Sequence, residues 1–211
     1  MIPEIGQFAL ILALSLAICQ TVLPLVGAHR NDVAMMGVGR TAATGQFVFV
    51  GIAFLCLTYA FLTDDFSVLY VANHSQLALP TLYKVSAVWG AHEGSLLLWI
   101  FLITAWTVAV SRFSSDLPEA FAARVIGVLG FLSVGFLLFA LLTSNPFDRL
   151  VPAAADGGDL NPLLQDPGLA IHPPLLYIGY VGFSVAFAFA IAAMISGDLD
   201  QRWAKWTRPW T

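Results

Sequence analysis

Long runs of apolar residues separated by polar loops dominate the pattern of this chain. A helix of about 20 mainly apolar residues crosses the hydrocarbon core of a membrane, and five runs reach roughly that length. The five runs lie at about 6–27, 43–63, 95–111, 122–143 and 174–196. The pattern therefore predicts an all-α fold, a polytopic membrane helix bundle. Two longer loops, at 64–94 and 144–173, separate the second run from the third and the fourth from the fifth.

The composition agrees with a membrane protein. Of the 211 residues, 59% are hydrophobic and 10% are charged, whereas soluble domains carry about 25% charged residues. The net charge of −4 comes with no cluster of basic residues, so we expect no nucleic-acid partner. Cys19 and Cys56 both lie inside apolar runs, and we expect them to be buried small residues rather than a redox pair or metal ligands.

The placement of lysine and arginine predicts how the bundle sits in the lipid bilayer. Of the nine basic residues, seven lie in the segments 28–42, 112–124 and 197–211, and two, Lys84 and Arg149, lie in the longer loops. Basic residues concentrate in short cytoplasmic loops. We therefore expect the N-terminus and both longer loops outside, and the short basic loops and the C-terminus inside.

Small residues at regular spacing mark faces where the helices are expected to approach one another closely. We assign these faces to packing and expect no chemistry from them. The predicted faces are Ala9, Ala13 and Ala17 in the first run, Gly127, Gly130 and Gly135 in the fourth, and Gly179, Gly182, Ala186 and Ala190 in the fifth.

The segment 166–182 stands where a polar loop meets the last apolar run, and it carries His172 followed by Pro173 and Pro174. A proline fixes its own φ and disfavours helical backbone in the residue before it. We therefore expect His172 to be extended and the helix to begin just after it. A stiff imidazole at a membrane surface suits ligation of a group presented from outside. The same residues fit a helix-start turn in which His172 only tolerates the interface, and the sequence leaves both interpretations open.

The segment 89–99 is too apolar for a fully solvated loop. Trp89 and Trp99 suit an interfacial aromatic band. Between them, His92 and Glu93 form a charged pair at a helix start, where the helix dipole favours a carboxylate. The His-Glu-x-x-His pattern of zinc proteases is absent, because position 96 is leucine, so we do not expect a metal site here.

The segments 89–99 and 165–184 closely resemble the N-terminal part of the CcmF family, haem lyase components of cytochrome c assembly, and the resemblance runs through essentially all of residues 1–211. Family members are much longer, and their tryptophan-rich outer segment and remaining haem histidines have no counterpart in this chain. The resemblance implies haem b as the substrate haem, with no catalytic side chain from this chain. At the outer face it implies His172 as an axial haem ligand supported by Pro173, Pro174 and Tyr177, with Trp89, His92 and Glu93 as possible further contacts.

The resemblance also implies a reaction and its partners. The lyase receives haem from the periplasmic haem chaperone CcmE and attaches it covalently to apocytochrome c, which subunits of the CcmH and CcmI type deliver. It lies in the bacterial inner membrane with its active face in the periplasm. This chain would need the missing C-terminal part of the lyase or a second split subunit, and we expect it to be inactive alone.

Two other classes of function remain open from the sequence. The chain could be a subunit of a haem or ion transporter or channel, although no charged residue sits in the middle of any of the five runs. It could also be a structural assembly subunit without a haem site of its own. Haem capture that depends on His172 is expected only of the lyase, whereas flux is expected only of the transporter.

Overall fold

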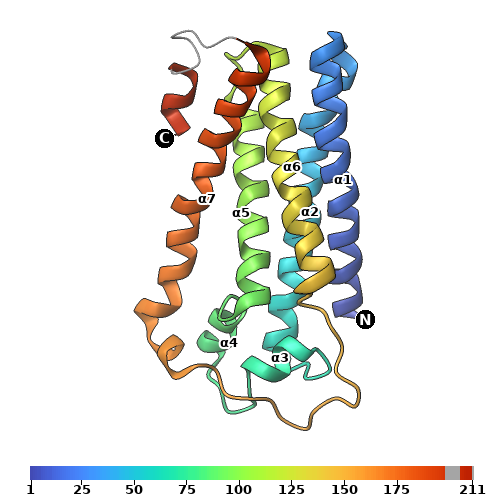
Figure 1. Ribbon diagram of the computed structural model, residues 1–211. Coiled ribbons are helices and arrows are strands. Elements are labelled where there is room, and N and C mark those ends of the chain that lie inside the picture. The colour runs from blue at the N-terminus through green and yellow to red at the C-terminus, as the bar shows by residue number, and fades with distance from the viewer. Residues whose placement is uncertain (198–204, 211) are drawn as a thin grey trace.

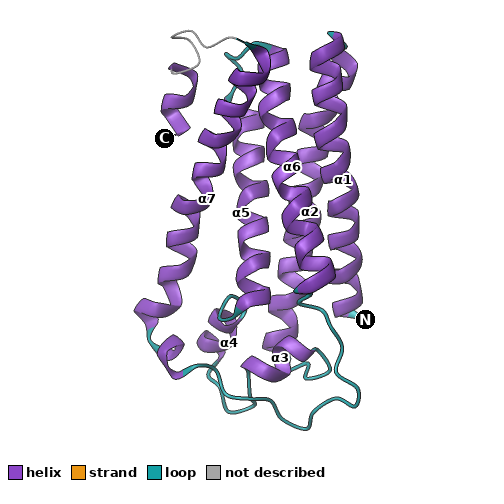
Figure 2. Cartoon of the chain, in the orientation of Figure 1, coloured by secondary structure: helices purple, strands orange, loops and turns teal. Residues whose placement is uncertain are grey.

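The fold is an up-and-down bundle of long helices with a layer of short helices and loops at one end (Figures 1 and 2). The computed structural model describes residues 1–197 and 205–210. Within these residues the regular elements are helices, and there is in addition one isolated β-bridge between Val68 and Arg149. Five helices are long and apolar enough to cross a membrane, so the predicted multi-pass bundle is confirmed. They are α1 (Ile2–Arg30), α2 (Val33–Leu62), α5 (His92–Phe113), α6 (Glu119–Thr143) and α7 (Pro167–Ser196).

The connections are divided between the two ends of the bundle as the sequence predicted. The N-terminus and both longer loops lie at one end, which we call the loop end, and short connections join the helices at the other (Figure 1). Which end faces the outside stays a prediction, and part of the third basic segment falls in residues 198–204, outside the described part of the chain. The shorter elements are α3 (Leu69–His74), α4 (Thr81–Ala87) and the 3-10 turns η1 (Pro162–Gln165) and η2 (Arg208–Trp210).

The small-residue face predicted in the first run is confirmed, since all three of its alanines are buried. In the fourth run the prediction holds for two glycines of three. A Cβ added at Gly127 would lie 2.7 Å from Cγ of Leu25, so the glycine lets α6 approach α1 closely. Gly130 meets α1 in the same way, whereas Gly135 has open space around it.

Two packing predictions are wrong. Gly179 has open space around it, so it does not serve a close approach to a neighbouring helix. Gly182 does face α5, since an added Cβ would lie 3.4 Å from the ring of Trp106. The buried residues of α7 are Ala170, Val181, Val185, Ala188, Phe189, Ala192 and Ala193. Cys56 is buried as predicted, but Cys19 is exposed on α1. A run that is apolar all round does not reveal in its sequence which side faces lipid.

A buried ion pair ties the end of α2 to α4. Nζ of Lys84 lies 2.6 Å from each carboxylate oxygen of Asp64, and the two side chains are only 9% and 19% exposed. Asp64 follows α2 in left-handed backbone, with φ of 52°. Because both charges have been withdrawn from water, each depends on the other, and removal of one leaves the other uncompensated.

We expect Lys84→Met to lower the midpoint of thermal unfolding in detergent by roughly 10 °C, because loss of one partner of a buried pair costs about 3–5 kcal/mol. Adding Asp64→Asn to this variant should restore most of the loss. The control is the exposed pair of Arg149 and Glu4, 3.4 Å apart. Glu4→Gln should change the midpoint by no more than ~3 °C, and equal shifts for the two pairs would contradict this account.

Candidate functional site

α7 begins at the loop end with a strong helix start. The carboxylate of Asp166 accepts a hydrogen bond from the backbone N–H of Leu169 at 3.1 Å, and Pro167 is the first helical residue. Aspartate and proline are preferred at these two positions. The helix then continues through His172 and both prolines after it. The prediction that His172 is extended and precedes the helix is therefore wrong, because the Asp-Pro start outweighs the local bias of a following proline.

His172 lies on an exposed side of α7 at the loop end. Its imidazole makes no hydrogen bond, ion pair or ring contact with the part of the chain that the structure describes. Apolar neighbours on the same helix are exposed as well, with Ile171 at 59% and Leu175 at 63%, while Pro173 and Pro174 are half-buried. An imidazole without a partner, set in apolar surface, is available to ligate a metal centre.

Aromatic rings bind the next turns of α7 to the bundle. The ring centroid of Trp99 lies 5.4 Å from that of Tyr177 and 5.5 Å from that of Tyr180. Trp99 also stacks on Phe136 of α6, with 5.8 Å between centroids. Trp99, Phe136 and Tyr180 line an open groove of about 480 Å³ between α5, α6 and α7. Tyr177 is thus turned toward α5, one to two turns beyond His172.

A tight turn before α5 is held at its centre by Tyr70 of α3. The buried hydroxyl of Tyr70 accepts a hydrogen bond from the N–H of Ala91 at 3.1 Å and donates to the carbonyl of Val88 at 3.2 Å. A Cβ at Gly94 would overlap that carbonyl oxygen, so only glycine fits there. Burial, with a smaller contribution from the negative charge of Glu93, raises the pKa of Tyr70. The phenol therefore stays protonated and can donate.

The indole of Trp89 connects this turn to α7. Its Nε1–H donates to the carbonyl oxygen of Ala170 at 2.9 Å, two residues before His172. The carbonyl of Trp89 in turn accepts a hydrogen bond from the hydroxyl of Ser95 at 2.8 Å. The structure thus brings Trp89 to the helical turn that carries His172, a link that the sequence did not reveal.

His92 and Glu93 lie in the first turn of α5, where Glu93 was predicted. Nε2 of His92 is 2.8 Å from the hydroxyl oxygen of Ser144, and its ring stands perpendicular to that of Phe139, 5.9 Å between centroids. These contacts place His92 beside the end of α6. Among the described residues, no group of three or more His, Cys, Asp or Glu side chains is arranged to hold a metal ion.

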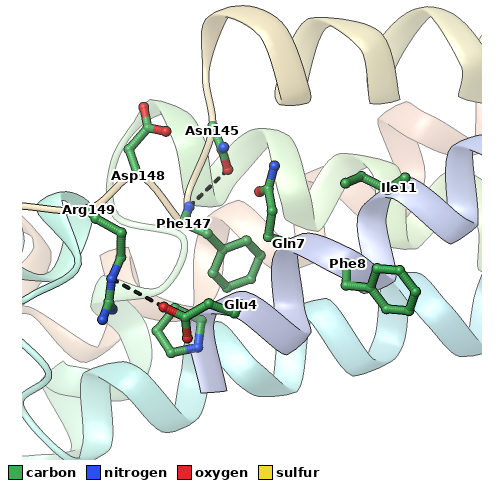
Figure 3. Close-up of a pocket in the computed structure, with 9 residues that line it drawn as sticks. Glu4, Gln7, Phe8, Ile11, Asn145, Phe147, Asp148 and Arg149 are labelled. Carbon is green, nitrogen blue, oxygen red and sulfur yellow. Dashed lines mark hydrogen bonds and ion pairs between the residues drawn. The ribbon is translucent and has the colours of Figure 1, made fainter. Parts of the chain in front are cut away.

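A second groove, which no pattern in the sequence indicated, lies at the loop end (Figure 3). It has a volume of about 330 Å³ and lies between the start of α1 and the segment that follows α6. The side chains of Glu4 and Arg149 meet beside it, with 3.4 Å between Nε and a carboxylate oxygen. Asn145 shapes the segment by accepting a hydrogen bond from the N–H of Phe147 at 3.0 Å. No spacing pattern could have paired these two regions, because most of the chain separates them.

Comparison with known proteins adds independent information. Residues 89–211 match the model of the family described as cytochrome C assembly protein. Over its whole length the chain is 65% identical to the cytochrome c-type biogenesis protein CcmF of Pseudomonas aeruginosa and 57% identical to that of Escherichia coli K12, covering 32% and 33% of these relatives. A solved structure of the cytochrome c haem lyase CcmF is similar over the whole chain, with a TM-score of 0.86 and 32% identity, and the match covers 33% of it.

The chain thus spans about a third of the length of the curated relatives that it matches. The resemblance carried by the segments 89–99 and 165–184 is confirmed by these comparisons. Because the family model matches more than half of its residues, the chain belongs to the cytochrome C assembly protein family, and it corresponds to the N-terminal portion of a CcmF protein.

Proposed function

We propose that this chain is the part of a cytochrome c haem lyase that receives haem b, and that His172 is an axial ligand of the haem iron. The observation that carries the proposal is the exposed imidazole of His172, which has no partner among the described residues. It stands at the loop end of a helix that two prolines stiffen.

The surroundings of His172 fit a haem. A porphyrin has two broad apolar faces, and the exposed side chains of Ile171, Leu175 and Leu176 offer apolar surface on the same helix. Burial of such surface against the porphyrin favours binding. Haem iron is commonly held by the neutral imidazole of a histidine, and Pro173 and Pro174 limit how far this imidazole can move with its backbone.

The loop end would face the periplasm of a bacterial inner membrane. The longer loops carry only two basic residues, Lys84 and Arg149. Both form ion pairs with acidic side chains. The opposite end carries the short basic loops, which favour the cytoplasm. Haem b would then arrive at His172 from a periplasmic haem chaperone of the CcmE type.

The reaction joins haem to apocytochrome c. Each cysteine thiol of the apocytochrome adds across one vinyl group of the haem, so that sulfur bonds to one vinyl carbon and hydrogen to the other. A thioether forms and no atom is lost. The contribution of the protein is to bind and orient the reactants. Subunits of the CcmH and CcmI type would deliver the apocytochrome, and the C-terminal part of the lyase or a split subunit would supply the second axial ligand.

His172→Ala should lose haem. With the detergent-purified chain and the haem-loaded chaperone, we expect the wild type to acquire a haem Soret band and His172→Ala to bind at least about 10-fold more weakly, because one iron ligand is gone. His74→Ala is the matched control, since Nδ1 of His74 lies 2.9 Å from the carbonyl oxygen of Tyr70 and is already engaged. Equal haem uptake by wild type and His172→Ala would refute the role of His172.

The proposed orientation can be tested by labelling in intact cells. Ala153 lies in the loop end and Ser115 in a short connection at the opposite end, and both are exposed. A membrane-impermeant maleimide should label Ala153→Cys before cell lysis and Ser115→Cys only afterwards. The two native cysteines lie within α1 and α2, and the unsubstituted chain measures their background. The reverse labelling pattern would place His172 on the cytoplasmic side.

A further inference from the structure

Two carbonyls in the first turns of α7 cannot be paired in the usual helical way, that of the exposed Leu169 and that of the buried Ala170. In an α-helix each carbonyl accepts a hydrogen bond from the N–H four residues later. For Ala170 that residue is Pro174, which has no N–H. Ala170 is only 6% exposed, and a buried carbonyl without a donor costs free energy.

The missing donor is supplied from outside the helix. Nε1 of Trp89 lies 2.9 Å from the carbonyl oxygen of Ala170, the length of a good N–H···O hydrogen bond. The indole N–H therefore replaces the backbone N–H that Pro174 removes. Trp89 is half-buried and packs against the main core cluster, so this donor is held by the body of the protein rather than by α7.

The position of Trp89 is itself fixed by its own turn. Its carbonyl accepts from the Ser95 hydroxyl at 2.8 Å, and its N–H donates to the carbonyl of Ser86 at 3.3 Å. The carbonyl just before it in the chain, that of Val88, accepts from Tyr70 and lies against Gly94. A donor fixed in this way sets where the first turns of α7 lie.

We infer that Trp89 is a positioning residue for haem ligation: its indole N–H replaces the donor lost at Pro174 and so fixes the turn of α7 that presents His172. This inference rests on the proposed role of His172. It also gives Pro174 a function, because with an N–H at position 174 the carbonyl of Ala170 would be paired within the helix and would not need Trp89. With Pro174 in place, the direction of the imidazole depends on Trp89.

Trp106 offers a matched contrast. Its Nε1–H donates to the carbonyl oxygen of Ile178 at 3.1 Å, so a second tryptophan bonds to the backbone of the same helix. The residue four positions after Ile178 is Gly182, which keeps its N–H. The Trp106 hydrogen bond is therefore an addition to the helical pattern, whereas that of Trp89 replaces a missing member of it.

The test is a double-mutant cycle on the full chain in detergent, with haem b as the probe and its dissociation constant and Soret spectrum as readouts. Trp89→Phe removes the indole donor and keeps an aromatic ring. Pro174→Ala returns a backbone N–H to the helix. Trp89→Phe should weaken haem binding about 3- to 10-fold, the effect of one lost hydrogen bond. In the Pro174→Ala background the same change should have less than about a 2-fold effect, and Trp106→Phe should leave binding unchanged.

Two results would overturn the inference. One is unchanged haem binding in Trp89→Phe. The other is the same loss of haem binding with Pro174 and with Pro174→Ala, which would attribute the loss to the altered ring rather than to the missing N–H. If wild type takes up no haem, the proposed function fails, and amide hydrogen exchange then decides the inference separately. Trp89→Phe should speed exchange about 3- to 10-fold in residues 168–176, and Trp106→Phe should not. Equal exchange in wild type and Trp89→Phe would refute the positioning role.

Discussion

The buried hydroxyl of Tyr70 is the constraint on which the loop end depends. A phenol withdrawn from water has to be hydrogen-bonded, and this one joins the N–H of Ala91 to the carbonyl of Val88. These two hydrogen bonds close the turn that leads into α5. The turn requires glycine at position 94, because any side chain there would overlap the carbonyl oxygen of Val88. Because burial raises the pKa of Tyr70, the hydroxyl keeps its proton and the turn keeps its donor as pH rises. From this turn Trp89 reaches α7.

The membrane helices could be predicted because lipid leaves a long apolar run one common solution, a helix that satisfies its own backbone. The start of α7 could not be predicted from the same rule. A local bias of Pro173 against a helical His172 competed with the cap formed by Asp166 and Pro167, and the lost donor was replaced by a side chain 81 positions away. The exposure of Cys19 was missed for another reason, since hydrophobicity alone does not distinguish a helix neighbour from lipid.

For the candidate site, the sequence singled out candidate residues but did not show how they contact one another. His172 was singled out by its prolines and by its place where a polar loop meets an apolar run, and the structure shows it exposed at the loop end of α7. The partnership of Trp89 with Ala170 joins a side chain to a backbone atom of another helix, and such a contact leaves no spacing signal. The same holds for the ion pair that joins Lys84 of α4 to Asp64, which follows α2. Long-range polar contacts are thus what the structure adds.

The interior of the bundle differs from its loop end in the chemistry that it can support. Within the described membrane helices the fully buried polar side chains are uncharged, as Gln20 and Gln46 are. The side-chain amide of Gln20 donates a hydrogen bond to the carbonyl oxygen of Ile126 at 3.0 Å. A hydrogen bond of this kind joins helices in a membrane. The imidazole of His172, exposed and without a partner among the described residues, instead stands at the loop end of the bundle. Because α7 leans away from α5 there (Figure 1), the direction of His172 is set by the loop-end turn rather than by close packing of the bundle.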